Sequence, residues 1–316
     1  MMSHRIRDMM LGIAIGDAFG AGYEFLKGGR EQVKAELSLE NYRQHPCPEF
    51  RRVPGLYTDD TQMSIAVAET LLSRKEFDHL NLANHFVKAF KRDNSIGYSK
   101  RMRTTLRASS SGNDFLEKID KNVNSNGAAM RAIPLGIVDD LDTIVQYAVI
   151  NAETTHDTPE GIASSIFVSL ASHYFIRRLD EKKKLIDFVH PYIQRVHQGA
   201  ADHLLAVSKL DSLDEDLIFG PDRPNKGVPC DAIKTIGAVL YVISNYKDDP
   251  RELLRHAVLL GGDTDSVASL SLGLAAINKG LDALPQWMLK KLTNHKYGKQ
   301  YIIELADKLT ERFGIE

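Results

Sequence analysis

The chain is poor in cysteine and carries almost no net charge. Its 316 residues include two cysteines, Cys47 and Cys230, which lie far apart and have no CxxC or CxxH pattern around them. This excludes a disulfide framework and a zinc site built from thiolates alone, and it favours a reducing cytoplasm. A net charge of −2, from 40 lysines and arginines against 42 aspartates and glutamates, gives no reason to expect a nucleic-acid groove or an anionic membrane partner.

Long apolar runs are also missing. The apolar stretch Met9–Ile15 lies between Asp8 and Asp17 and is far shorter than the ~20 residues that span a bilayer. It also lacks the small-residue cleavage pattern of a signal peptide. A hydrophobic content of 43% with 26% charged residues is typical of a folded chain and excludes extensive disorder. We therefore expect a soluble, cytoplasmic protein.

Helical spacing of apolar residues dominates what is present. Met63, Val67 and Leu71 recur at every fourth position, for example. Residues 143–150 and 235–243 are rich in β-branched side chains, but neither segment has a hairpin partner or a turn signal nearby, so both are assigned to helices. Helices are predicted over residues 5–22, 61–73, 80–92, 127–137, 140–151, 159–177, 183–197, 231–245, 251–259, 264–279, 285–293 and 299–313.

Three polar stretches, at residues 27–57, 108–126 and 211–230, separate these helices and are predicted to be long loops. Long loops in a compact domain are often functional. None of the three has the composition of a flexible linker. We therefore expect one compact all-α domain over residues 1–316, and a monomer.

Glycine occurs at every fourth position of the first predicted helix, at Gly12, Gly16 and Gly20. Each glycine costs about 1 kcal/mol relative to alanine inside a helix. Three glycines on one face therefore indicate that another backbone packs very close, although simple tight helix packing would explain them too.

Two acidic segments each precede a predicted helix. The first is Tyr57–Thr61, with sequence YTDDT, and the second is Gly261–Ser266, with sequence GGDTDS. Capping is the ordinary explanation, because Asp, Thr and Ser side chains accept hydrogen bonds from the free N–H groups of the first turn, for about 1 kcal/mol. The helix dipole also favours negative charge at this end.

The two segments together exceed what capping requires, since one cap uses one side chain and each segment offers three or four oxygen donors. Adjacent carboxylates repel each other by ~4 kcal/mol at 4 Å if the effective dielectric constant is near 20. If the two helix starts converge, a cation is the natural remedy. Ligands that are all oxygen favour Mg²⁺, Mn²⁺ or Ca²⁺ over zinc or copper. Four carboxylates with hydroxyls could hold a pair of ions, as in hydrolases that generate hydroxide from water.

Five short motifs follow one another along the chain. In order, they are Gly16-Asp17 with Gly20 and Glu24; Thr58-Asp59-Asp60-Thr61; Asn126-Gly127-Ala128-Ala129-Met130-Arg131 with Pro134 and Gly136; Thr155-His156; and Gly262-Asp263-Thr264-Asp265-Ser266. This series resembles the ADP-ribosylglycohydrolase family, which includes the dinitrogenase-reductase-activating glycohydrolase. The resemblance covers about residues 8–290.

The resemblance implies an all-α domain with a cleft that holds two metal ions, Mg²⁺ or Mn²⁺. It also implies hydrolysis at C1″ of the distal ribose, which releases ADP-ribose from a protein or small-molecule acceptor. Glu24 would contact the metal site or activate water, and Asp60 would also be catalytic. The metal ligands carried over by motif are Thr58, Asp59, Asp60, Asp263, Asp265 and Ser266, where Ser266 keeps the hydroxyl of the threonine that is usual in the family.

The resemblance further implies a substrate site. A glycine-containing loop that opens a helix presents free N–H groups to an anion, so the segment Asn126–Arg131 would hold a diphosphate and a ribose. An ordinary loop-to-helix start is the alternative. His156 would line the ADP-ribose site, or would be a local turn residue bonded to Thr155 or Asp157. The substrate-binding residues implied are Tyr98, Ser125, Asn126, Gly127, Met130, Arg131 and His156.

One position departs from the family pattern. Arginine-specific members often carry an acidic residue in an Asp-Ile-Gly segment, and the corresponding segment here is Asn94–Tyr98, with Ser95 in the acidic place. A serine cannot pair with a guanidinium as strongly as a carboxylate can. An arginine-linked substrate is therefore in question, and serine-linked, nucleotide-linked and small-molecule conjugates stay open.

Two other functions are possible. The dipeptide His156-Asp157 occurs in helical HD-type phosphohydrolases, which would have to recruit His85, His190 or His197 as further ligands. None of these three has a convincing sequence context. A non-catalytic ADP-ribose-binding relative is the second alternative, and it is weakened because Glu24 and all four motif aspartates are present.

Overall fold

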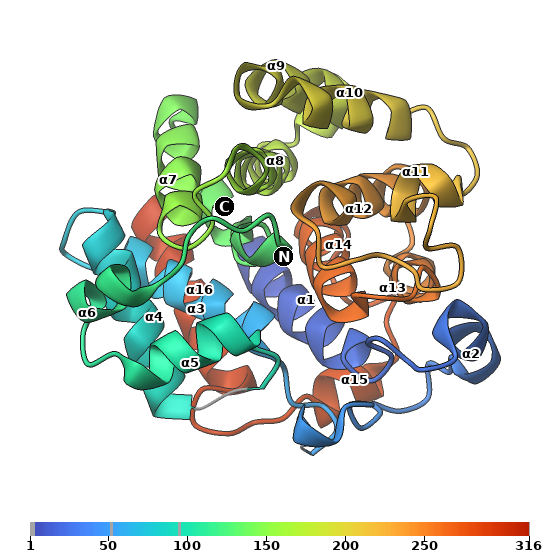
Figure 1. The fold of residues 1–316 in the computed structure, drawn as a ribbon, viewed down its shortest axis with the longest axis horizontal. Helices are drawn as coiled ribbons and strands as arrows, with labels where there is room; N and C mark the ends of the chain where they lie inside the picture. Colours follow the sequence, from blue (N-terminus) through green and yellow to red (C-terminus); the bar gives the residue numbers. More distant parts are fainter. Residues whose placement is uncertain (1–3, 51–52, 94–95, 316) are drawn as a thin grey trace.

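The computed structural model describes residues 4–50, 53–93 and 96–315, and within these ranges it contains helices and no β-strand. One isolated bridge joins Val228 to Gly262. The all-α prediction is therefore confirmed (Figure 1). The described α-helices are α1 (Arg5–Gly20), α2 (Gly29–Glu36), α3 (Asp59–Leu72), α4 (His79–Asp93), α5 (Lys100–Ala108), α6 (Gly112–Lys118), α7 (Leu141–Glu153), α8 (Pro159–Ile176), α9 (Leu185–Val196), α10 (Gln198–Val207), α11 (Glu215–Phe219), α12 (Ala232–Tyr246), α13 (Pro250–Leu259), α14 (Thr264–Lys279), α15 (Gln286–Lys291) and α16 (Lys299–Phe313). Four short 3₁₀ helices join them: η1 (Pro48–Phe50), η2 (Asn126–Ala128), η3 (Ile133–Ile137) and η4 (Leu179–Glu181).

The centre of the molecule is formed by α1, α8 and α14 (Figure 1). Each of these helices is buried over nearly its whole length rather than along one stripe. A helix that is apolar or small-sided on every face is typical of the middle of a domain. The amphipathic helices α4, α9 and α16, in contrast, lie farther out, with one face on the core.

The glycines of α1 explain how its neighbour approaches so closely. The helices α1 and α14 run antiparallel, and a Cβ on Gly16 or Gly20 would collide with the carbonyl oxygen of Ala268 or Thr264. A Cβ on Gly12 would lie 2.9 Å from the carbonyl oxygen of Leu272. The close backbone approach predicted from the glycine spacing is thus confirmed. It places the end of α1 directly beside the start of α14.

Several helix predictions are corrected by the structure. The stretches 27–57, 108–126 and 211–230 are not loops throughout, because they contain α2, α6 and α11. The helices α5 and α10 were not predicted. Both begin at side-chain caps: the hydroxyl of Ser99 accepts from the N–H of Met102, and Nδ1 of His197 accepts from the N–H of Ala200. Each of these helices is short, and the apolar spacing of α5 rests on two buried residues, Met102 and Leu106.

The helix predicted over residues 127–137 is also corrected, because this segment is broken into η2, a turn and η3. Pro134 stands at the start of η3, where its missing N–H is tolerated. Gly136 packs against α8, where a Cβ would lie 2.5 Å from the amide nitrogen of His173. The two β-branched segments, in contrast, are helical as predicted, within α7 and α12. Among the described residues, no helix combines the length and apolar character needed to cross a bilayer.

Candidate active site

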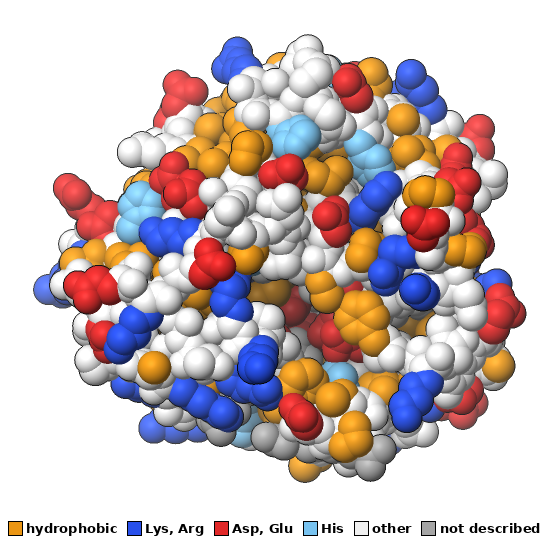
Figure 2. All heavy atoms as spheres, in the orientation of Figure 1, with side chains coloured by type: hydrophobic (Ala, Val, Ile, Leu, Met, Phe, Trp, Pro, Cys, Tyr) orange, Lys and Arg blue, Asp and Glu red, His pale blue; other side chains and the backbone are white. Residues whose placement is uncertain are grey.

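A pocket lies where α1 ends and where α3 and α14 begin, with α5 and η2 on its other sides. Figure 2 shows acidic side chains at the bottom of a hollow on this face. All the site residues predicted from the sequence line the pocket except Thr58, which is buried behind it. The lining residues are Glu24, Asp59, Asp60, Gly97, Tyr98, Ser99, Arg101, Met102, Ser125, Asn126, Gly127, Met130, Arg131, His156, Cys230, Asp263, Asp265 and Ser266.

The start of α3 is capped by a side chain from another helix. The carboxylate of Asp17, on α1, accepts hydrogen bonds from the N–H groups of Thr58 (2.9 Å) and Thr61 (3.0 Å) and from the Thr61 hydroxyl (2.6 Å). Burial raises the pKa of Asp17 to about 6 although these bonds favour its charged form. Because Asp17 satisfies the first turn of α3, the carboxylates of Asp59 and Asp60 are not needed as caps and face the pocket.

The start of α14 is positioned by backbone geometry. Gly261 and Gly262 have φ values of +67° and +77°, which glycine adopts without strain. The Thr264 hydroxyl donates to the carbonyl oxygen of Gly20 (2.8 Å), which fixes the start of α14 to the end of α1. Asp263 stands at the N-cap position but makes no side-chain cap bond, and its carboxylate instead accepts from the Asn126 amide (2.8 Å).

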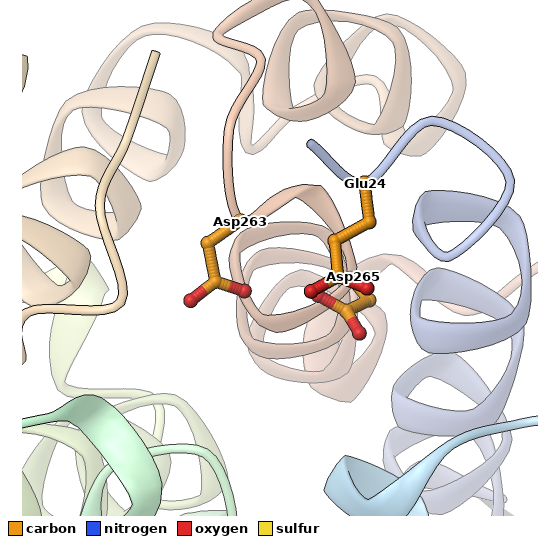
Figure 3. A group of neighbouring side chains, drawn as sticks. All are labelled: Glu24, Asp263 and Asp265. Carbon is orange, nitrogen blue, oxygen red and sulfur yellow. The ribbon is translucent and has the colours of Figure 1, made fainter. Parts of the chain in front are cut away.

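Three carboxylates converge at this point (Figure 3). One oxygen each from Glu24, Asp263 and Asp265 lies within 4.8 Å of the others. Glu24 comes from the turn after α1, where the N–H of Phe25 donates to the carbonyl oxygen of Gly262 (2.9 Å). Burial raises the pKa of the Glu24 carboxyl, and a hydrogen bond from His45 opposes that rise.

The carboxylates in the pocket repel one another. Burial, followed by the repulsion of neighbouring carboxylates, raises the pKa values of Asp59, Asp60 and Asp265 well above their usual range. Oδ1 of Asp60 is buried and has no hydrogen-bond partner among the described residues. A buried oxygen without a partner, inside a set of mutually repelling oxygen donors, fits a hard divalent cation. The acidic cluster could therefore bind a metal ion.

Thr58 does not line the pocket, but it connects the two acidic segments. Its side chain is fully buried, and its hydroxyl lies 3.5 Å from Oδ2 of Asp265, so it joins the start of α3 to the start of α14. The two acidic segments, which are about 200 residues apart in the sequence, thus meet at one pocket.

The lining of the pocket also includes two arginines, Arg101 and Arg131. Arg131 is fully buried and donates to the side chain (2.7 Å) and carbonyl (2.8 Å) of Asn151 and to the Thr155 hydroxyl (2.7 Å). Its Nη1 has no partner among the described residues. Arg101 donates to the carbonyl oxygen of Asp120 (2.6 Å). Burial, and then the charge of Arg101, lower the pKa of Arg131 to about 9.

His156 lies between these arginines and the η2 loop. Its Nε2 is 2.9 Å from the Ser125 hydroxyl and its Nδ1 is 2.7 Å from the Thr155 hydroxyl. A Cβ at Gly127 would collide with its ring, so this glycine is required for the ring to sit where it does. Burial and the two neighbouring arginines lower the pKa of His156 well below its usual value, which leaves the ring neutral. The bond to Thr155 expected of a turn residue is present, and the ring also lines the pocket.

The segment around Gly97 packs against Asp59 and the start of α3. Gly97 has a φ of +99°, and a Cβ there would collide with the Asp59 carboxylate. The hydroxyl of Tyr98 donates to Oε1 of Gln62 on α3 (2.6 Å), and the ring is buried. Ser95, the residue in the acidic place of the family pattern, lies outside the described residues.

The histidines of the phosphohydrolase alternative do not gather here. His85, His190 and His197 are absent from the described pocket lining. Nδ1 of His85 is bonded to the carbonyl oxygen of Asn81, and His197 caps α10. His156 therefore has no partner histidine for an HD-type site among the described residues.

Three polar residues of the site had no role assigned from the sequence: Asp17, His45 and Arg101. Asp17 stood in a motif, but its contact with α3 lies 41 residues away in the chain. His45 and Arg101 lie outside the sequence motifs, Arg101 on the short helix α5. Cys230, noted only as an isolated thiol, lines the pocket as well.

The comparisons with known proteins agree with this architecture. The sequence matches the ADP-ribosylglycohydrolase family over residues 2–315. The chain belongs to the ADP-ribosylglycohydrolase family. A solved structure described as an ADP-ribosylglycohydrolase-related protein complex superposes with a TM-score of 0.73 at 23% identity, and the match covers 98% of this chain and 99% of that one.

The relatives that are named for an activity have low sequence identity to this chain. ADP-ribosylhydrolase ARH3 of Mus musculus is 23% identical, over 89% of this chain and 85% of the mouse protein. ADP-ribosylarginine hydrolase Tri1 of Pseudomonas putida is 25% identical, over 98% of this chain and 78% of the bacterial protein. An uncharacterized protein of Archaeoglobus fulgidus is 29% identical, over 98% and 97%. The relatives support a family of ADP-ribosyl hydrolases.

Proposed function

We propose that the protein is a metal-dependent hydrolase that cleaves the C1″ glycosidic bond of ADP-ribose conjugates and releases ADP-ribose. The observation that carries the proposal is the division of charge within one pocket. Carboxylates from two helix starts and from Glu24 form one group, while Arg101 and Arg131, which form no ion pair with a carboxylate among the described residues, stand in another group around Thr155 and His156. Such a pocket suits a ligand that has an anionic part and a reacting centre close to bound cations.

The acidic cluster would hold two ions, Mg²⁺ or Mn²⁺. The proposed ligands are the side chains of Asp59, Asp60, Asp263, Asp265 and Ser266, with the Thr58 hydroxyl beside Asp265. When bound, these ions would supply positive charge and lower the pKa of a water molecule. The fit rests on the unpartnered Oδ1 of Asp60 and on the mutual repulsion of the buried carboxylates.

Glu24 is proposed to orient and deprotonate the attacking water. Water adds to C1″ while the bond from C1″ to the acceptor breaks, and the acceptor leaves with a proton. The transition state carries oxocarbenium character, so a carboxylate beside the ribose stabilises it. Glu24 suits the task because it is partly buried, lies beside Asp263 and Asp265, and comes from a turn that the contact of Phe25 with Gly262 holds in place. Asp60 is a second candidate base.

The residues around η2, the two arginines and His156 are proposed to bind the rest of ADP-ribose. The N–H groups of the η2 loop, Ser125 to Gly127, would face the diphosphate, with the Arg101 guanidinium as a cation beside them. Arg131, whose Nη1 has no hydrogen-bond partner among the described residues, would add a second positive charge. Met130, Tyr98 and the neutral His156 would contact the sugar and base through apolar and ring surfaces.

The acceptor is proposed to be a serine-linked, nucleotide-linked or small-molecule conjugate rather than arginine. Ser95 in place of an acidic residue removes the counter-charge for a guanidinium. The Tri1 relative acts on ADP-ribosylarginine by its name, so this part of the proposal needs a direct test.

The test is a release assay on ADP-ribosylated arginine, ADP-ribosylated serine and small conjugates, with Mg²⁺, with Mn²⁺ and with a chelator. We expect metal-dependent ADP-ribose release, and a loss of roughly 10²–10⁴-fold in kcat for Glu24→Gln, because general-base assistance is worth about that much. Glu311→Gln, an exposed glutamate of α16, is the matched control. Tight ADP-ribose binding with no release from any conjugate would instead identify a non-catalytic binding protein.

A further inference from the structure

Glu24 is held by a histidine that lies outside the pocket. Nε2 of His45 is 2.6 Å from Oε2 of Glu24, and Nδ1 of His45 accepts a hydrogen bond from the N–H of Cys47 (2.9 Å). Because Nδ1 accepts, its lone pair is not protonated, and the ring proton is on Nε2. His45 is therefore the donor and Glu24 the acceptor. The direction of this hydrogen bond is set by the backbone of the 45–47 turn.

The segment that carries His45 is docked firmly onto the turn after α1. Arg43 covers Gly22, where a Cβ would lie only 2.7 Å from the Cβ of Arg43. The N–H of Ser38 donates to the hydroxyl of Tyr23 (3.1 Å), and the guanidinium of Arg43 lies 4.8 Å from the ring centre of Tyr23. The His45 ring is 7% exposed and packs edge-on against Phe50. The imidazole is thus in place before any ligand binds.

His45 is absent from the described lining of the pocket and touches the site at Glu24. We therefore expect its effect on the reaction to pass through Glu24. The partly buried Glu24 carboxylate lies beside those of Asp263 and Asp265, and their repulsion favours an orientation turned away from them. One hydrogen bond to Oε2 both stabilises the carboxylate and selects one side-chain orientation.

We propose that His45 is a positioning residue: its Nε2–H fixes the Glu24 carboxylate with one oxygen bound and the other turned to the metal and water side of the pocket. This inference rests on the proposed function, since it assigns His45 a part in that reaction. It also makes a statement about the metal-free protein, namely that the His45 ring is held as the Nε2–H tautomer by its two neighbours.

Two variants separate the two contacts of the ring. His45→Gln keeps an N–H donor near the place of Nε2, whereas His45→Asn keeps an acceptor near the place of Nδ1 and loses the donor to Glu24. With the conjugate that the wild type cleaves, we expect His45→Asn to lower kcat by about 10–100-fold with KM within about threefold. His45→Gln should retain most of the wild-type kcat. The thermal midpoints of both variants are measured alongside.

The readout that does not depend on activity is nitrogen NMR of histidine-labelled, metal-free protein. We expect the His45 resonance of the Nε2–H tautomer, and a shift of its Nε2–H signal in Glu24→Gln. A wild type that cleaves no conjugate contradicts the proposed function. An active wild type with full kcat in His45→Asn overturns the role of His45 alone. Equal losses of kcat in His45→Gln and His45→Asn, in step with their thermal midpoints, would also overturn it, because they would show a structural residue.

Discussion

Two kinds of helix start contain aspartate in this molecule, and the structure separates them. In α7, α12 and α13 the aspartate before the helix is an ordinary cap: Asp231, for example, accepts from the N–H groups of Ile233 (3.0 Å) and Lys234 (2.9 Å). At the start of α14, Asp263 makes no such bond, and at the start of α3 the capping is done by Asp17 from α1.

The difference shows what the pocket aspartates are for. A cap stabilises its helix, whereas Asp59, Asp60 and Asp265 are buried beside one another and their pKa values are raised by burial and mutual repulsion. Such a cluster costs stability in the metal-free protein. Residues that destabilise the fold and line a pocket are typical of a functional site. The comparison can be tested by changing one aspartate of each kind.

The largest effect is expected for Asp265→Asn. Removing one carboxylate weakens the cation site, so we expect binding of Mg²⁺ or Mn²⁺ to fall at least tenfold and ADP-ribose release to fall by about 100-fold or more. The same change relieves repulsion. The metal-free variant should therefore be more stable than the wild type at pH 7.5, where the Asp265 carboxyl with its raised pKa is the unfavourable group.

Calorimetry with each metal and thermal unfolding in a chelator check both parts. Asp249→Asn is the matched control, since asparagine caps a helix as well as aspartate does and Asp249 lies at the start of α13. Equal metal affinity in Asp265→Asn and the wild type would contradict the metal site.

Asp17→Ala is expected to be the most damaging to stability. Its carboxylate satisfies two backbone N–H groups and one hydroxyl at the start of α3, and the site is fully buried. Leaving these donors unpaired should lower the free energy of unfolding by roughly 2–4 kcal/mol. Denaturant unfolding measures the loss. A loss no larger than that of an exposed cap would mean that water replaces the carboxylate.

The contrast between cap and cluster could be predicted from the sequence only in part. Glycines four residues apart indicated the close packing of α1 on a second backbone, and the acidic segments indicated a cation, because both signals are local. The contact of Asp17 with Thr58 and that of His45 with Glu24 join distant segments that carry no shared pattern. The helices α5 and α10 are short, each begins at a capping side chain, and each offers few large apolar residues as a periodic signal.

The family resemblance predicted more site residues than spacing and charge alone did, but Arg101 was not among them. This arginine lies on α5, a short amphipathic helix with only two buried apolar residues, Met102 and Leu106. The break of residues 127–137 into η2 and η3 was not predicted either, although Pro134 at the start of η3 is a local signal against one continuous helix. The packing of Gly136 on α8 is a tertiary contact that the sequence pattern does not carry.

A smaller effect is expected for Asp231→Ala, the ordinary cap of α12. The carboxylate accepts from two N–H groups at a partly exposed site, so its loss should cost about 1 kcal/mol. Metal affinity should stay unchanged, because the cap bonds are local. Denaturant unfolding and calorimetry on this variant, set beside Asp265→Asn, give opposite signs for stability. A gain in stability in both variants would remove the distinction between the two kinds of helix start.

The smallest effect is expected for Asp8→Asn, which tests whether a raised carboxyl pKa outside the pocket behaves in the same way. Burial, followed by the charge of Asp282, raises the pKa of Asp8 to about 6, against the pull of His4 and Arg7. At about pH 3, well below the ordinary aspartate pKa, the group is protonated in both the folded and the unfolded chain, so the variant and the wild type should be equally stable. Between about pH 4 and pH 6 the unfolded chain ionises while the folded protein stays protonated, so the wild type loses stability that the variant keeps, and the loss is complete above about pH 6.

Because Asp8 is only partly buried, solvent screening limits the difference at pH 8 to on the order of 1 kcal/mol. Unfolding curves from about pH 3 to pH 8 measure it, with Asp142→Asn, an exposed aspartate in the first turn of α7, as the control that should stay close to the wild type. A constant difference across this range would show that a packing change, rather than ionisation, separates Asp8→Asn from the wild type.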